Sequence, residues 1–224
     1  MRVELDKSST SKEIYHLLRK EIISWNLVPG LNISEKEISE KFNVSRTPVR
    51  EAFVRLSNEG LLNIYPQKGT FVSLIDLSAI DEGRFMREHM ERAVIKLACK
   101  SFCDEKIIQL EMSLKFQKMY NENHDYKNLF EEDDKFHTLI FEGCKKKRIF
   151  TSINEMNSDF QRVRELNLID DLKWEDIYSQ HVGILDAIKS RQPVLAEKIV
   201  KEHLGNFVLN KDELKCKYPG YFKE

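Results

Sequence analysis

The sequence has few residues that break helices, with 8 glycines and 5 prolines among 224 residues. It has no apolar run near the roughly 20 residues that a membrane-spanning helix needs. The first residues, Met1 to Asp6, contain no apolar signal core. We therefore expect a cytoplasmic protein that contacts no membrane, and a chain that is mostly helical. The length allows one large domain or two small ones, each with its own core.

Cysteine is also scarce, and the four cysteines, Cys99, Cys103, Cys144 and Cys216, form no CxxC pair. This spacing argues against a zinc finger. In a reducing cytoplasm we expect no disulfide.

The chain also lacks a large net charge of either sign, since its net charge is −1. The first 75 residues carry 11 Lys and Arg against 9 Asp and Glu, so they have a small positive excess. For a protein that reads a DNA groove, the placement of single arginines matters more than this total.

The stretch from Asn43 to Phe53 predicts a tight turn followed by the second helix of a helix-turn-helix. Ser45 is a suitable N-cap, and Pro48 lies in the first turn, where its missing N–H costs nothing. Apolar residues then recur at helical spacing and should face a core. These residues are Val49, Phe53, Leu56 and Leu61.

Two arginines in this helix, Arg46 and Arg50, are four residues apart and share the face opposite the core. A guanidinium can pair with guanine O6 and N7 or bind a phosphate. Ordinary solvated arginines are the alternative, which the surrounding pattern disfavours.

The flanking segments complete the expected winged helix. Residues 8–24 predict a first helix, and Ser34 with Glu37 predicts a capping box at the start of a second one. Two β-rich runs, 61–65 and 69–73, predict a hairpin, or wing. Its tip, Lys68 and Gly69, can approach a phosphate or the minor groove. A hairpin that only covers the core is the alternative.

From Ser78 onward the chain predicts helix after helix, and so an antiparallel all-α bundle. A basic run, Lys145 to Arg148, is best explained as a solvated loop between two of these helices. The expected helices span 78–102, 104–121, 125–143, 148–168, 173–190 and 193–213.

Four residues of the helical half are candidate metal ligands. Asp133 and His137 are four residues apart, so both can face one ion, and His181 and His203 lie on later helices. Three imidazoles and a carboxylate suit Zn²⁺, Ni²⁺ or Mn²⁺. Spacing alone leaves open a surface pair of Asp133 with His137 and no metal.

The stretch from Ile14 to Val72 resembles the winged helix of GntR-type bacterial transcriptional regulators. The resemblance implies that Arg46, Thr47 and Arg50 contact DNA, that Lys36 is the basic residue at the start of the second helix, and that Gly69 is the wing glycine. In one departure, Trp25-Asn26 stands where the family usually has a glycine. The matching segments are Leu18-Arg19, Leu27-Val28-Pro29-Gly30, Glu37-Ile38, Val44 to Ala52, Arg55-Leu56, Glu59-Gly60-Leu61 and Gly69 to Val72.

The helical half resembles the FCD ligand-binding domain of the FadR-type branch of these regulators, in the six-helix, VanR-like form. The match includes Asp133-x-x-Phe136-His137, His181-x-x-Ile184-Leu185 and Ala196-x6-His203-Leu204, and so all four ligand positions. The expected division is therefore a DNA-binding domain over 1–75 and an effector-binding and dimerisation domain over 76–224.

The resemblance also implies an effector with a carboxylate. Arg87, in Arg87-x3-Glu91, is a candidate to bind it, although a structural salt bridge with Glu91 is an equal alternative. Arg162 and Arg164 are weaker candidates for the same role.

These features predict a homodimeric transcriptional regulator, a repressor rather than an activator and not an enzyme. It should bind an inverted-repeat DNA operator and respond to a small organic acid held beside a divalent metal. Two alternatives stay open. One is a metal-dependent hydrolase that uses the Asp/His site, and the other is a regulator whose metal is purely structural.

Overall fold

The computed structural model describes residues 7–167, 174–205 and 211–224. Within these ranges the chain forms helices and one small sheet, and it divides into two compact units. The first unit comprises Met1–Ile80, Glu155–Glu165 and Asn210–Glu224, and the second comprises Asp81–Asn154 and Leu166–Leu209. None of the described helices combines the length and the apolar character that crossing a bilayer requires.

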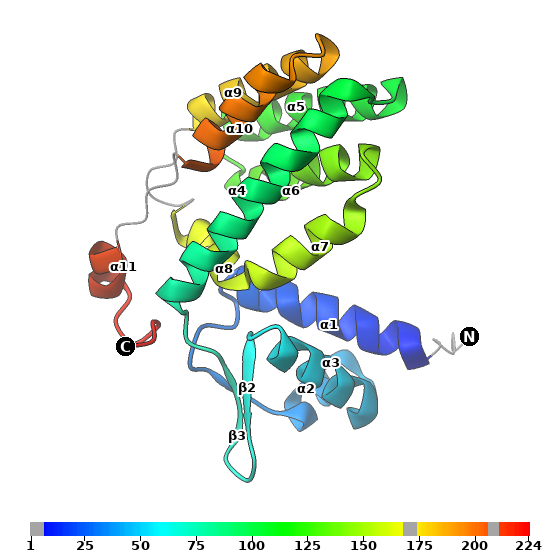
Figure 1. The fold of residues 1–224 in the computed structure, drawn as a ribbon. Coiled ribbons are helices and arrows are strands. Elements are labelled where there is room, and N and C mark those ends of the chain that lie inside the picture. The colour runs from blue at the N-terminus through cyan, green and yellow to red at the C-terminus, as the bar shows by residue number, and fades with distance from the viewer. Residues whose placement is uncertain (1–6, 168–173, 206–210) are drawn as a thin grey trace. The chain divides into compact units, whose positions relative to one another are not determined.

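The first unit contains the expected winged helix (Figure 1). Its helix-turn-helix core is built on the apolar side of α3, where Val49, Phe53, Leu56 and the following Leu61 are buried as predicted. The elements are α1 (Lys7–Ile23), β1 (Asn32–Ile33), α2 (Glu35–Phe42), α3 (Arg46–Asn58), β2 (Leu62–Tyr65) and β3 (Gly69–Val72).

Helix α2 begins with the predicted capping box. The Ser34 hydroxyl accepts a hydrogen bond from the Glu37 N–H, and the Ser34 N–H donates to the Glu37 carboxylate, each at 3.1 Å. Ser45 occupies the N-cap of α3, but its side chain makes no capping hydrogen bond. The expectation that the Ser45 hydroxyl caps the helix is therefore wrong, although the helix starts where predicted.

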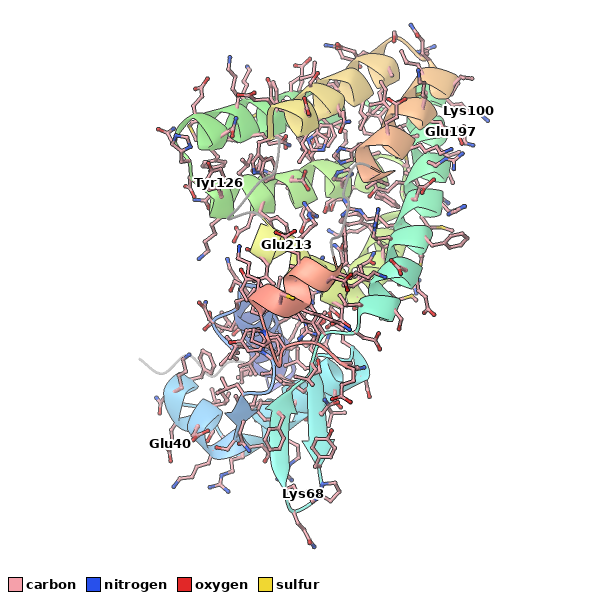
Figure 2. The ribbon with its side chains drawn as sticks, turned by 90° about the vertical axis from the view of Figure 1, so that its left-hand side faces the viewer. Glu40, Lys68, Lys100, Tyr126, Glu197 and Glu213 are labelled. Carbon is pink, nitrogen blue, oxygen red and sulfur yellow. The ribbon has the colours of Figure 1, made fainter. Side chains whose placement is uncertain are left out.

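The three strands form an antiparallel sheet in the order β1-β3-β2. Tyr65 is paired with Gly69 at the hairpin end, and Leu62 is paired with Val72 at the other end. Gly69 has φ +112°, which a residue with a Cβ adopts only with strain. Lys68 lies at the tip of this hairpin (Figure 2), so the basic side chain is carried on a short, fixed turn.

A buried carboxylate joins α1 to the end of α3. Glu59, the C-cap of α3, accepts hydrogen bonds from the Tyr15 hydroxyl and from Arg19 Nε, both at 2.7 Å. Arg19 also donates to Gln161 of α8 (Ser158–Asn167) at 2.9 Å. A helix that follows the winged helix by nearly a hundred residues is thus part of the same unit.

The C-terminal segment joins this unit as well. Ile75 pairs in parallel with Phe222, and its N–H and C=O bond to Tyr221 and Lys223 at 2.9 Å. A short helix, α11 (Lys211–Lys217), precedes this contact. The linker that follows the wing is therefore held by the last residues of the chain.

Trp25 explains the departure from the family pattern noted above. Its backbone has φ +61°, a conformation that favours glycine. The indole ring lies 6.0 Å from the Tyr218 ring and 5.4 Å from the Tyr221 ring, and Nε1 donates to the Arg162 carbonyl at 2.7 Å. The side chain thus links the turn after α1 to α8 and to the C-terminal segment.

The second unit is a helical bundle whose core is lined by apolar residues from all of its helices. Helix α5 packs on both α6 and α9, and α9 packs on α10 (Figure 1). Its helices are α4 (Leu77–Lys100), which begins at the end of the first unit, α5 (Asp104–Glu122), α6 (Tyr126–Gly143), α7 (Lys147–Met156), α9 (Trp174–Lys189) and α10 (Pro193–Gly205).

Two helix predictions need correction. The single helix expected over 148–168 is two helices, α7 and α8, separated at Asn157. Asn157-Ser158-Asp159 is a run of residues that favour helix starts. The helix expected over 193–213 ends at Gly205, and a separate helix starts at Lys211, while residues 206–210 lie outside the described residues. The six-helix count that pointed to a VanR-like subtype is therefore wrong for the described part of the chain.

The Trp25 contacts generate a stability prediction. Trp25→Phe keeps a ring but loses the bond to Arg162, and should lower the free energy of unfolding by about 1 kcal/mol. Trp25→Ala also loses both ring contacts and should cost about 3 kcal/mol. Urea unfolding followed by circular dichroism measures both. Equal stability of the phenylalanine variant and the parent would show that the hydrogen bond contributes nothing.

Candidate functional site

The first candidate site is the exposed side of the helix-turn-helix. Arg46, Thr47 and Arg50 all lie exposed on the first two turns of α3, opposite the buried residues of that helix. Lys36 is exposed near the start of α2, and Lys68 and Gly69 are exposed at the wing tip. Each predicted DNA-contacting residue is therefore accessible to a ligand.

Arg50 is held in place before any DNA arrives. Its Nε and Nη2 donate to the two Glu35 carboxylate oxygens, both at 2.9 Å, and this pairing holds the pKa of Glu35 below its ordinary value. A bidentate pair fixes the plane of the guanidinium as well as its position. Glu35 therefore orients the Arg50 guanidinium.

The second candidate site lies inside the bundle. Asp133 and His137 on α6, His181 on α9 and His203 on α10 each place one potential ligand atom so that all four atoms lie within 4.8 Å of one another. We call these four residues the quartet. Asp133, His137 and His181 are buried, and His203 is partly buried. The structure thus brings together four residues that span 70 positions of sequence.

Each imidazole of the quartet is oriented by an acceptor behind it. Nδ1 of His137 lies 2.8 Å from Glu91 Oε2, Nδ1 of His181 lies 2.8 Å from Gln117 Oε1, and Nδ1 of His203 lies 3.0 Å from Gln180 Oε1. Carboxylate and amide oxygens only accept, so Nδ1 carries the proton in all three rings. This tautomer leaves the lone pair on Nε2, which is the atom a metal would use.

The Nε2 atoms meet at distances that suit one ion. Nε2 of His137 lies 3.3 Å from Nε2 of His203, and Nε2 of His181 lies 3.5 Å from Asp133 Oδ1. Two ligand atoms that each lie about 2.1 Å from one ion in tetrahedral geometry are about 3.4 Å apart. Two neutral imidazoles that face each other through their lone pairs repel, and a cation between them removes that repulsion. The ligand set therefore fits a divalent metal.

Electrostatics around the quartet favour a neutral His203. Burial, reinforced by the neighbouring His181 and His137, holds the pKa of His203 well below its ordinary value. A neutral imidazole is the form that binds metal.

Glu91 connects the quartet to an arginine. The buried Glu91 carboxylate accepts from Arg87 Nε at 2.6 Å and from His137 Nδ1 at 2.8 Å. Burial alone would raise the pKa of Glu91, but its interactions with His137 and Arg87 outweigh burial and lower that pKa. The salt bridge offered as the alternative role of Arg87 is therefore present, and it places Arg87 next to the quartet.

Arg162 makes its contacts in the first unit. Arg162 is fully buried in the first unit, where Nη1 donates to the Ser73 carbonyl at 2.7 Å and Nη2 forms an ion pair with Asp159. Burial lowers the pKa of Arg162. Arg164 is buried on the same helix, in the same unit. The contacts of Arg162 fix α8 to the end of the wing. They give no support to the predicted role of Arg162 in effector binding.

One small cavity adjoins the quartet. Its volume is about 10 Å³, and it is lined by Glu91, His137 and apolar side chains of the bundle core. That volume holds about one water molecule. A small organic acid needs more room than this cavity provides, so it would enter the cavity only if the lining side chains or helices moved.

Sequence reasoning missed two of the three orienting acceptors. Gln117 is buried on α5 and also contacts Ser113, one turn away. A polar pair at core positions of a predicted helix was the available signal. Gln180 stands directly before His181, but nothing in the sequence shows that it faces His203.

Comparisons with known proteins match both halves of the chain. The model of bacterial regulatory proteins of the gntR family matches residues 10–72, and the FCD domain model matches residues 84–206. Over 227 residues the chain is 31% identical to the HTH-type transcriptional repressor RspR of Escherichia coli (strain K12), with 100% of both chains covered. It is 25% identical over 182 residues to the Nta operon transcriptional regulator of Aminobacter aminovorans, with 81% and 85% covered.

Solved structures share the fold. E. coli McbR/YncC superposes with a TM-score of 0.80 at 18% identity, covering 93% of this chain and 98% of that one. A transcriptional regulator GntR from Rhodococcus sp. RHA1 superposes with a TM-score of 0.70 at 21% identity, covering 88% and 95%.

The position of Glu91 generates the prediction for this site. Glu91→Gln removes the carboxylate that pairs directly with the buried Arg87, and should lower the free energy of unfolding by about 3–5 kcal/mol. Glu88→Gln, on the same helix, removes an ion pair with Arg92 that is partly exposed, and should cost less than about 1 kcal/mol. Urea unfolding in the presence of a chelator measures both variants without a contribution from bound metal.

The difference in stability between the parent and Glu91→Gln should depend on pH, with a sign that the pKa of Glu91 determines. The pKa of Glu91 is lowered on folding, so its stabilisation is fully present above the unfolded value of about 4.3 and is lost as the pH falls below it. The difference between the parent and Glu91→Gln should therefore shrink in acid. A difference that stays constant from pH 7 to pH 3 would contradict this role.

Proposed function

Because the chain belongs to the GntR family of bacterial regulatory proteins and carries an FCD domain after its DNA-binding domain, we propose that it is a homodimeric repressor released from DNA by a small organic acid. The family models and the relatives are those of transcriptional regulators, so the chain is not an enzyme. The hydrolase alternative is thereby set aside. We propose residues 1–75 as the part that reads DNA, in the cytoplasm, and 76–224 as the part that senses the acid and dimerises.

The DNA-reading role is supported by the accessible side of α3. Arg46, Thr47 and Arg50 would enter the major groove, while Lys36 and the wing residues Lys68 and Gly69 would approach phosphates or the minor groove. Two such heads related by a twofold axis require an operator that is an inverted repeat.

The sensing role depends on one observation, the convergence of three imidazoles and a carboxylate inside the bundle. We propose that the quartet holds Zn²⁺, Ni²⁺ or Mn²⁺. Bound there, the ion would supply positive charge and coordination positions open to an acid. Arg87, one of the arginines expected to bind the effector, has a salt bridge that reaches a ligand of the quartet through Glu91.

The small cavity supports a coupling between acid and DNA. An acid cannot enter a space of about 10 Å³ without displacing neighbouring groups, so it would bind preferentially to a more open arrangement of the helices. The change in DNA affinity is bounded by the difference in the affinity of the acid for the two arrangements.

Substitution of the arginines tests the DNA-reading role. Arg46→Ala and Arg50→Ala should each weaken binding to the operator about 10-fold to 100-fold if each reads a base, with a smaller effect on random duplex DNA. The operator can be selected from random duplexes with the full-length parent protein, and affinity measured by gel shift. Arg191→Ala, which removes an exposed arginine from the α9–α10 turn, is the control. Unchanged operator affinity in both variants would refute the assignment.

Substitution of an orienting acceptor tests the metal site. Gln117→Leu removes the acceptor behind His181 and should lower the affinity for Zn²⁺ about 10-fold to 100-fold, as measured by competition with a chelator. Gln109→Leu, at a partly exposed position on the same helix, should leave the affinity unchanged. Equal affinities in the two variants would argue against a metal at the quartet.

A thermal-shift screen of small organic acids separates the sensing role from a purely structural metal. We expect at least one acid to raise the melting temperature of the metal-loaded protein and to lose that effect when the metal is removed. If chelation lowers the melting temperature but no acid ever shifts it, the metal is structural.

A further inference from the structure

The second unit contains a larger cavity whose lining differs from that of the quartet. Its volume is about 670 Å³, and it lies between α4 and the turn that leads from α6 into α7. Met86, Met90 and Ile149 provide apolar walls, and Lys145, Lys146 and Arg148 provide positive charge. This volume lies within the range of sites that bind small molecules.

The positive charge in this cavity is largely unneutralised. Within the described part of the chain, Lys145, Lys146 and Arg148 have no ion-pair partner, whereas their neighbour Lys147 is paired with Glu142 at 2.6 Å. Helix α7 starts at Lys147 with no acidic residue in its first turn, so its terminal N–H groups add to the positive potential. A cavity wall this basic favours an anion.

The basic turn is also rigid. Lys145 adopts φ +58°, and its N–H bonds to the Glu142 carbonyl at 2.9 Å. The N–H of Lys146 bonds to the Phe141 carbonyl at 2.7 Å, and the Ile149 N–H bonds to the Lys146 carbonyl at 2.9 Å. Because these hydrogen bonds hold the backbone, a ligand would have to order mainly the exposed side chains of the turn. The run expected to be only a solvated loop is thus one wall of a cavity.

From these features we propose that the cavity binds a small amphiphilic anion, with a phosphate or carboxylate head at Lys145, Lys146 and Arg148 and an alkyl chain against Met86, Met90 and Ile149. Methionine side chains adapt to alkyl chains of different shape, and the lysine and arginine heads bind an oxyanion. The site is distinct from the quartet and does not depend on the proposed metal. Its two methionines directly precede Arg87 and Glu91 on α4, so an occupant would touch the helix that orients His137.

Octyl phosphate is a probe that carries both halves of this chemistry. The full-length, metal-loaded protein, labelled at its methionine methyl groups, is titrated and followed by NMR, with Met86→Leu and Met90→Leu used to assign the two signals. We expect both signals to shift, and inorganic phosphate and octanol to bind at least about tenfold more weakly than octyl phosphate. Removal of the metal should leave the binding in place. Unmoved Met86 and Met90 signals, or binding that disappears with the metal, would overturn the proposal.

A matched pair of charge variants completes the test. Lys145→Ser with Arg148→Ser should weaken octyl phosphate binding at least about tenfold. Lys115→Ser with Lys118→Ser removes the same charge from exposed positions of α5 and should change nothing. Equal weakening in both pairs would mean that only bulk charge is involved. Sedimentation of the variants provides the last check. If Lys145→Ser with Arg148→Ser changes the oligomeric state, and octyl phosphate does not change that of the parent, a second copy of the chain covers the cavity. The proposal would then be wrong.

Discussion

The orientation of three imidazoles, two of them buried and one partly buried, is the constraint on which the bundle depends. Each ring is fixed by an acceptor on a different helix: Glu91 on α4, Gln117 on α5 and Gln180 on α9. Because these acceptors hold the Nδ1 protons, the three Nε2 atoms must face a common point. Five helices therefore meet at one polar centre within an otherwise apolar core. A cation at that centre would remove the repulsion between the facing lone pairs, so the proposed sensing site would also be a packing centre of the bundle.

The wing is completed by residues far along the chain. Arg162 of α8 binds the Ser73 carbonyl, Trp25 binds the Arg162 carbonyl, and Ile75 pairs with Phe222. The buried charge of Arg162 is matched by Asp159, whose carboxylate also accepts the Asp76 N–H. The segment between the wing and α4 is thus held on both sides by parts of the chain that lie beyond most of the bundle. A change in α8 would act directly on this segment.

The sequence predicted the side of α3 that is exposed and the four residues of the quartet, since helical spacing and the family resemblance bear directly on those positions. It did not predict which polar side chains stand behind the histidines, because no local pattern shows that Gln117 will face His181. The division at Asn157 had a local signal in the helix-starting residues Asn157-Ser158-Asp159. The pairing of Ile75 with Phe222 had no local signal, because neither segment contains a sequence pattern that indicates a partner so far along the chain.

The way the first unit is assembled has a consequence for synthesis. Its three segments, Met1–Ile80, Glu155–Glu165 and Asn210–Glu224, leave the ribosome at widely separated times. The bonds of Ile75 to Tyr221 and Lys223 form only after these two residues have emerged, well over a hundred residues later. Translation therefore finishes the histidine-bearing helices before the N-terminal fold acquires its last contacts, and a truncated nascent chain cannot present a completed DNA-binding unit to the chromosome.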